Sequence, residues 1–206
     1  FWGDFCVMNF QAMIIKTIID PATIVRHMNS LNLKPTELLQ ALFFVSISSV
    51  ILTYLTFWLP NIIFGEKATD LTLILSIVNN NPFIFVLLQS AIILFISILV
   101  AFGGQFFKGL GTFDCALAGV LWINFILLII NLVQIILIIS IPILADILAL
   151  MASFWSLWAL VIFSKELHGF NSIAVTGFVG LLLFTVSISI LGIILAFFGF
   201  VAIEGI

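Results

Sequence analysis

Two long runs without a single Asp, Glu, Lys or Arg constrain this sequence more than any other feature. They cover residues 115–145 and 167–203. A helix needs about 20 mainly apolar residues to cross a hydrocarbon core of about 30 Å. Hydrophobic residues make up 64 % of the chain and charged residues 7 %, whereas soluble domains average about 45–50 % and about 25 %. The sequence therefore predicts an all-α, polytopic membrane helix bundle and excludes a cytoplasmic enzyme.

The few charges also exclude a nucleic-acid-binding protein. The six Lys and Arg residues and nine Asp and Glu residues give a net charge of −3. Because no basic surface is available to neutralise phosphates, we expect no nucleic-acid partner.

The charges and prolines divide the apolar sequence into five predicted transmembrane spans. Pro60 is expected to end the first span, and a tight turn near Ser140 separates the third from the fourth. A cytoplasmic N-terminal segment, residues 1–35, precedes a five-span domain, residues 36–206. The predicted spans are residues 38–59, 82–102, 115–138, 143–164 and 173–198.

The distribution of Lys and Arg sets the expected orientation, because these residues are retained on the cytoplasmic side. With the N-terminus inside, only Lys67 lies outside. The other five basic residues are then cytoplasmic: Lys16, Arg26, Lys34, Lys108 and Lys165. The opposite orientation would place five of the six outside.

The N-terminal segment contains one further predicted helix. Residues 5–19 are mostly apolar, too short to cross, and followed by Asp20-Pro21. We expect a short amphipathic helix lying in the cytoplasmic interface; the alternative is that it packs on the bundle.

Spans three and four carry the polar residues that would lie within the membrane. Asn124, Asn131 and Gln134 fall within a sector of roughly 80° of one helix. Asp146 lies as far beyond Ser140 as Gln134 lies before it. One hypothesis is a polar pocket of these four residues. The alternative is structural: a carboxylate in a first helical turn is favoured by the helix dipole, and Asn and Gln bonds join helices.

The predicted cytoplasmic ends supply the second set of candidates. Residues 103–114 form a Gly-rich loop that lacks the GxxxxGK[ST] pattern of a phosphate-binding loop. Thr112 or Asp114 can cap the next helix. Basic side chains at headgroup level attract anionic lipid, so we expect lipid-headgroup or partner contacts at four residues: Lys34, Lys108, Lys165 and His168. No catalytic constellation, metal-ligand spacing or cofactor motif is present, so catalytic residues, metal and cofactor are all expected to be absent.

The order of several short elements resembles the Yip domain family, the Ypt/Rab-interacting proteins. Asp20-Pro21 precedes span one, K-G-L-G-T-F at 108–113 precedes span three, and Trp155 and Trp158 lie in span four. K-E-L-H-G-F-N-S at 165–172 then leads into span five. The G-T-F and H-G-x-x elements are the more specific parts of this resemblance, which extends from about Asp20 to the C-terminus.

The resemblance implies a five-span fold with a cytoplasmic N-terminus. Eukaryotic members act in ER–Golgi vesicle traffic, bind prenylated Rab GTPases and pair with Yif-type relatives. Those members carry D-L-Y-G-P and G-Y elements that this chain lacks, and its one tyrosine, Tyr54, lies in span one. We therefore expect the prokaryotic branch and a prokaryotic cell membrane, with an ER or Golgi membrane as the alternative, and we do not expect Rab binding.

Together these features predict a non-enzymatic scaffold or accessory subunit of the Yip type. Its expected partners are membrane lipids and another membrane protein or a second copy of itself. The alternative is a small transporter or channel that uses the polar pocket around Asp146.

Overall fold

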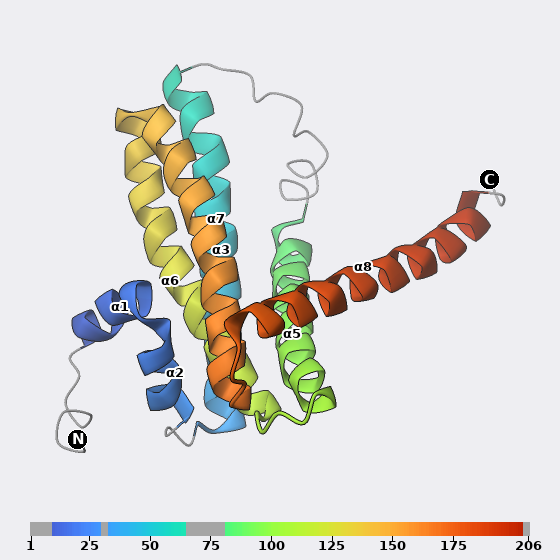
Figure 1. Cartoon of the computed structure of the whole chain (residues 1–206). Coiled ribbons are helices and arrows are strands. Elements are labelled where there is room, and N and C mark those ends of the chain that lie inside the picture. Colours follow the sequence, from blue (N-terminus) through green and yellow to red (C-terminus); the bar gives the residue numbers. More distant parts are fainter. Residues whose placement is uncertain (1–9, 30–32, 65–80, 204–206) are drawn as a thin grey trace.

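The computed structural model describes residues 10–29, 33–64 and 81–203, and all of its regular elements there are helices. Within these residues, two short helices come first and five long ones follow (Figure 1). They are α1 (Phe10–Ile19), α2 (Pro21–Asn29), α3 (Pro35–Phe64), α5 (Pro82–Phe106), α6 (Phe113–Ser140), α7 (Pro142–His168) and α8 (Ile173–Ile203).

Helices α3, α5, α6 and α7 form an antiparallel bundle (Figure 1). Helix α6 packs against each of the other three. All four are long and apolar enough to cross a membrane. Each of the five predicted spans lies within one observed helix, and the polytopic helical fold is thereby confirmed. The predicted turn after span three is a single residue, Ile141, followed by Pro142 at the first position of α7, where the missing proline N–H costs nothing.

One predicted helix end is wrong. Helix α3 continues through Pro60 to Phe64, whereas proline was expected to end it. Proline removes one backbone hydrogen bond. Apolar helices of membrane proteins tolerate this loss because local adjustments and neighbouring groups satisfy the freed carbonyl.

Helix α8 differs from the other long helices in its direction. It begins beside the end of α7, packs on α5 and α7, and then runs away from the bundle at a wide angle (Figure 1). Its apolar segment among the residues with described side chains is Ile173–Ser187, shorter than a span. The described residues therefore contain four helices that meet the criteria for crossing.

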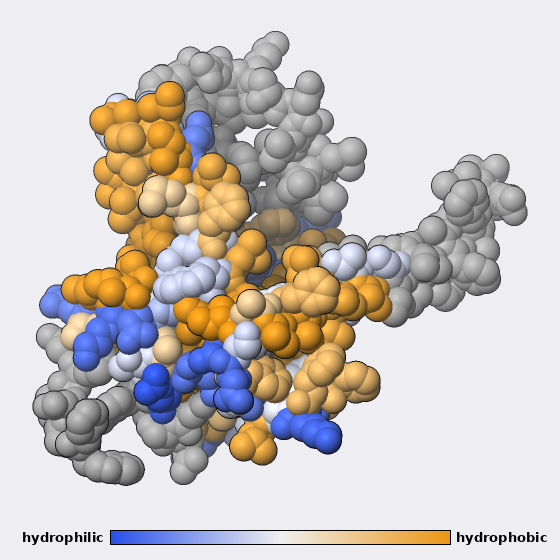
Figure 2. All heavy atoms as spheres, in the orientation of Figure 1, coloured by the Kyte–Doolittle hydropathy of each residue, from blue (hydrophilic) through white to orange (hydrophobic). Residues whose placement is uncertain are grey.

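The surface of the bundle is apolar and its interior is built of small and branched residues. Ala101, Ala116, Ala145 and Ala159 are fully buried, which lets the helices approach closely, as is usual in membrane bundles. Large side chains such as Phe154, 67 % exposed, face outward. Figure 2 shows apolar side chains over the upper bundle and most hydrophilic ones near its lower end.

The N-terminal segment forms two helices that pack on the bundle. Helix α1 ends at Ile19, and α2 follows after Asp20, whose carboxylate accepts a hydrogen bond from Thr23 Oγ1 at 2.6 Å. Ile24 and Val25 of α2 are 1 % exposed. The end of the first predicted helix before Pro21 is confirmed, but α2 was not predicted. Residues 5–9 of the predicted helix lie outside the described residues.

Two indole N–H groups bind α1 to the bundle. Trp122 Nε1 of α6 donates to Thr17 Oγ1 at 2.9 Å, and Trp155 Nε1 of α7 donates to the carbonyl oxygen of Ile18 at 3.1 Å. The exposed side of α1 carries Ile15 and Ile19, 58 % and 73 % exposed. Helix α1 therefore packs on the bundle with one side and leaves an apolar side free.

Helices α6 and α7 approach each other closely at Gly119. A Cβ atom added to Gly119 would overlap the ring of Phe163, which is 4 % exposed. Glycine at this position is therefore a packing requirement, because the ring occupies the space that any side chain would need.

We predict that Gly119→Ala destabilises the protein by about 1–3 kcal/mol, the usual effect of overpacking a filled site. Thermal unfolding in detergent would measure it. Gly180→Ala is the matched control, because a Cβ there meets no atom within 4 Å. Adding Phe163→Leu to Gly119→Ala should recover part of the loss; equal stability of Gly119→Ala and wild type would contradict the packing.

Candidate functional site

The imidazole of His168 joins three segments of the chain at one end of the bundle. His168 is the last residue of α7 and is 3 % exposed. Its Nδ1 accepts the N–H of Gly111 at 3.2 Å, and its Nε2 lies 2.9 Å from the carbonyl oxygen of Val100 in α5. These partners fix a neutral ring with its proton on Nε2, since one ring nitrogen must accept and the other must donate. The structure therefore places His168 inside the protein, which corrects its expected place at headgroup level.

Three glycines of the Gly-rich loop make room for this ring. A Cβ atom added at Gly104, Gly109 or Gly111 would collide with the His168 side chain. Gln105 Nε2 donates to the carbonyl oxygen of Gly111 at 2.9 Å and closes the loop on itself. The glycines surround an imidazole, and this explains a loop whose spacing does not fit phosphate.

The loop begins with a C-terminal helix cap that holds Lys108 in an unusual conformation. The backbone N–H of Gly109 donates to the carbonyl oxygen of Gly104 at 2.9 Å. The backbone N–H of Lys108 donates to the carbonyl oxygen of Gln105, also at 2.9 Å. This is the Schellman pattern, in which a glycine normally takes the left-handed position. Here Lys108 takes it, with φ of 65°. Its side chain is exposed, between Phe106 and Leu110, which are 81 % and 87 % exposed.

The other predicted basic contacts lie at the same end of the bundle in different surroundings. Lys34 is exposed, and its backbone N–H donates to Glu37 Oε2 at 2.9 Å, which caps α3. Lys165 is half-buried and pairs with Glu166 at 3.0 Å. Glu166 also pairs with Arg26 of α2 at 3.3 Å. Among the residues that the structure describes, Lys108 forms no ion pair.

The structure does not assemble the predicted polar pocket through hydrogen bonds. Asn124 donates to the carbonyl oxygen of Val120 in its own helix at 2.8 Å. Asn131 and Gln134 are half-buried and Asp146 is exposed. No hydrogen bond joins these four residues to one another. The functional role of Asp146 stays a prediction.

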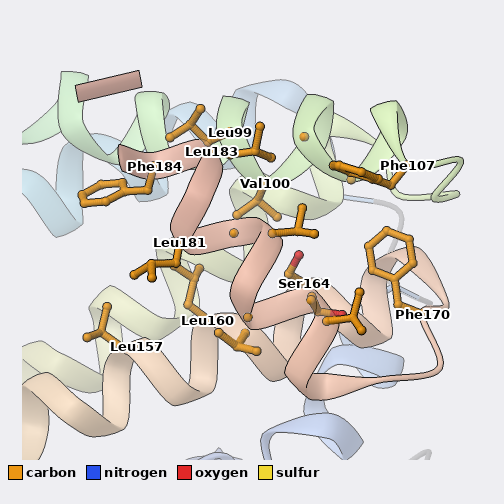
Figure 3. A pocket seen from close by; sticks show the side chains of 18 of the residues that line it. Leu99, Val100, Phe107, Leu157, Leu160, Ser164, Phe170, Leu181, Leu183 and Phe184 are labelled. Carbon is orange, nitrogen blue, oxygen red and sulfur yellow. The ribbon is translucent and has the colours of Figure 1, made fainter. Parts of the chain in front are cut away.

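An apolar groove lies beside His168, between α5, α7 and α8 (Figure 3). Its volume is about 640 Å³, within the range of about 300–1,000 Å³ for ligand pockets. Phe107 and Phe170 lie at one end and Leu157 and Phe184 toward the other. Its polar lining residues are Ser164, Asn171, Ser172 and Thr176. Within the described parts of the chain, no three His, Cys, Asp or Glu residues lie close enough to hold a metal ion.

His168 supports one wall of this groove. Val100 and Gly104, which contact the imidazole, also line the groove. Phe170 stacks on the imidazole with ring centroids 5.4 Å apart and lines the groove as well. The Gly-rich loop, the end of α7 and the start of α8 therefore form one continuous site.

The sequence contained a signal for the His168 contacts but none for the groove. The glycines at 103–111 and the H-G pair at 168–169 are both visible in the sequence, but their contact is not. The groove residues are apolar in a chain where most residues are apolar, and only the packing of α8 separates them from lipid-facing ones.

A comparison with protein families matches the Yip1 domain over residues 15–202, from α1 almost to the end of α8. The chain belongs to the Yip1 domain family. This confirms the family resemblance; the prokaryotic branch stays a prediction. Comparisons with curated proteins and with solved structures found no match. In this Yip1 domain the two elements that carried the resemblance, G-T-F at 111–113 and H-G at 168–169, meet at the imidazole of His168.

We predict that His168→Ala destabilises this Yip1 domain by about 1–3 kcal/mol, because the N–H of Gly111 loses its acceptor in a buried site. Thermal unfolding in detergent would measure the loss, and limited proteolysis would detect opening of the loop at 107–112. Lys34→Ala, at an exposed side chain, is the control. Wild-type stability and proteolysis of His168→Ala would contradict the proposed role of the imidazole.

We also predict that Lys108→Gly raises the free energy of unfolding by about 1 kcal/mol, since only glycine adopts the left-handed conformation without a steric penalty. The same unfolding assay applies. Lys108→Ala is the comparison, because it removes the charge and keeps a Cβ atom. Equal stability of the two variants would show that the left-handed conformation is not the cause.

Proposed function

We propose that this Yip1 domain is a non-enzymatic scaffold or accessory subunit that binds lipid or another membrane protein. The observation that carries the proposal is the groove between α5, α7 and α8, because it offers an apolar partner a preformed site of about 640 Å³. Its wall is held by the buried hydrogen bonds of His168 rather than by a flexible loop. A preformed site loses little entropy on binding.

The absence of catalytic chemistry around the groove supports a binding role. Its polar groups are hydroxyl and amide side chains with no neighbouring acid or base among the lining residues. The one nearby imidazole, His168, has both nitrogens bonded to backbone groups. A general base needs a free lone pair within reach of its substrate. The Yip1 family is, moreover, not an enzyme family.

The membrane in which the protein works belongs to the same proposal. The lack of the cytoplasmic motifs of eukaryotic relatives favours a prokaryotic cell membrane and argues against Rab binding. The basic end of the bundle, with Lys34, Lys108 and Lys165, faces the cytoplasm in this proposal, as the retention of Lys and Arg requires.

We predict that native mass spectrometry of the protein, extracted gently from its own membrane, detects a stoichiometric lipid or membrane-protein partner. A bare chain in every detergent tested would contradict the binding role.

A variant of Asp146 separates the scaffold from the transporter alternative. In a scaffold, Asp146→Asn changes stability by at most about 1–2 kcal/mol and leaves partner retention intact. If wild-type protein in vesicles carries a substrate flux that Asp146→Asn abolishes, the protein is a transporter instead.

A further inference from the structure

We propose that the groove between α5, α7 and α8 binds one anionic phospholipid, with an acyl chain along its apolar lining and the headgroup phosphate against Lys108. This inference rests on the proposed binding function and names the partner.

The volume of the groove favours an acyl chain over a whole transmembrane helix as its occupant. One turn of a helix about 10 Å wide with a pitch of 5.4 Å fills roughly 420 Å³. A volume of about 640 Å³ therefore holds less than two turns, far short of a span. An acyl chain is much thinner and can follow a narrow groove of this volume along its length.

The lining of the groove matches a molecule with one apolar and one polar end. Leu99, Leu157 and Phe184 lie along it, and Phe107 and Phe170 mark one end (Figure 3). The polar residues Asn171 and Ser172 follow Phe170 directly, so they belong to that same end. The other two polar lining residues, Ser164 and Thr176, lie near the end of α7 and in the first turn of α8, so the polar part of the groove lies near the connection between these helices.

The charge beside that end selects an anionic headgroup. Lys108 directly follows Phe107, its side chain is exposed, and it forms no ion pair within the described part of the chain. Lys165, by contrast, is already paired with Glu166. A lysine near a membrane surface attracts anionic lipid, and its long stem lets the ammonium group reach the headgroup level.

The backbone at Lys108 supports a binding role for this residue. Its φ of 65° is a conformation that glycine adopts at no steric cost. The flanking side chains of Phe106 and Leu110 are almost fully exposed. The loop therefore carries an exposed cation and exposed apolar side chains within five residues, a combination that suits the boundary between headgroups and acyl chains.

Gly180 gives a direct way to block the groove. It lines the groove, and a Cβ atom built there meets nothing within 4 Å. A larger side chain at this position therefore extends into open space beside the groove, which the acyl chain would occupy. Ala174 lies on the same helix, is exposed, and is not among the lining residues, so Ala174→Leu is the matched control.

The test is native mass spectrometry of the purified full chain in detergent. Phosphatidylglycerol and phosphatidylcholine with identical acyl chains serve as the probes. Wild type should retain one phosphatidylglycerol molecule in preference to phosphatidylcholine.

Gly180→Leu should weaken retention of both lipids by about tenfold, within the range for overpacking a filled apolar site. Ala174→Leu should behave as wild type. Lys108→Gln should reduce the preference for phosphatidylglycerol by about fivefold and leave retention of phosphatidylcholine unchanged. Thermal unfolding of each variant checks that the fold is intact.

The remaining outcomes separate failure of this inference from failure of the proposed function. Equal lipid retention by Gly180→Leu and Ala174→Leu would overturn the groove as the lipid site. Wild type that retains a membrane protein and no lipid, with Gly180→Leu releasing that protein, would overturn the lipid but keep the accessory function. Flux that depends on Asp146 would overturn the proposed function itself.

Discussion

The groove depends on one buried imidazole. His168 connects the end of α7 to α5 and to the loop before α6 through two backbone groups. Without it, the loop would keep its helix cap at Gly104 and Gln105 but would lose its hydrogen bond to α7. Because a buried backbone group without a hydrogen-bond partner is costly, this contact helps to fix where the three segments lie relative to one another.

The sequence predicted most of the helices because charge and proline mark their ends. The uncharged run at 115–145 is too long for one comfortable span, and Pro142 indicated a turn near its end. The same reasoning failed at Pro60, where proline lies inside α3. The same reasoning also missed α2, because a nine-residue helix of mixed polarity does not stand out by its hydropathy. The pair Asp20-Pro21 is nevertheless typical of a helix start.

The candidate site was predictable only in parts. The Gly-rich loop and the basic residues were recognised from the sequence, but their relation to His168 was not. The partners of the imidazole, Gly111 and Val100, lie 57 and 68 residues away in sequence, and no local pattern reports such a contact. Similarly, Gly180 is one glycine among 13, and only the position of α8 shows that it faces open space.

The attachment of α1 has a consequence for the order of events during synthesis. Thr17 and Ile18 emerge from the ribosome before the indoles that bind them, which follow 105 and 137 residues later. The N-terminal helices therefore wait, without their final contacts, until α6 and α7 have been inserted. Since chains are made at about 5–20 residues per second, this interval lasts several seconds. The exposed isoleucines of α1 favour its association with the membrane surface during that time.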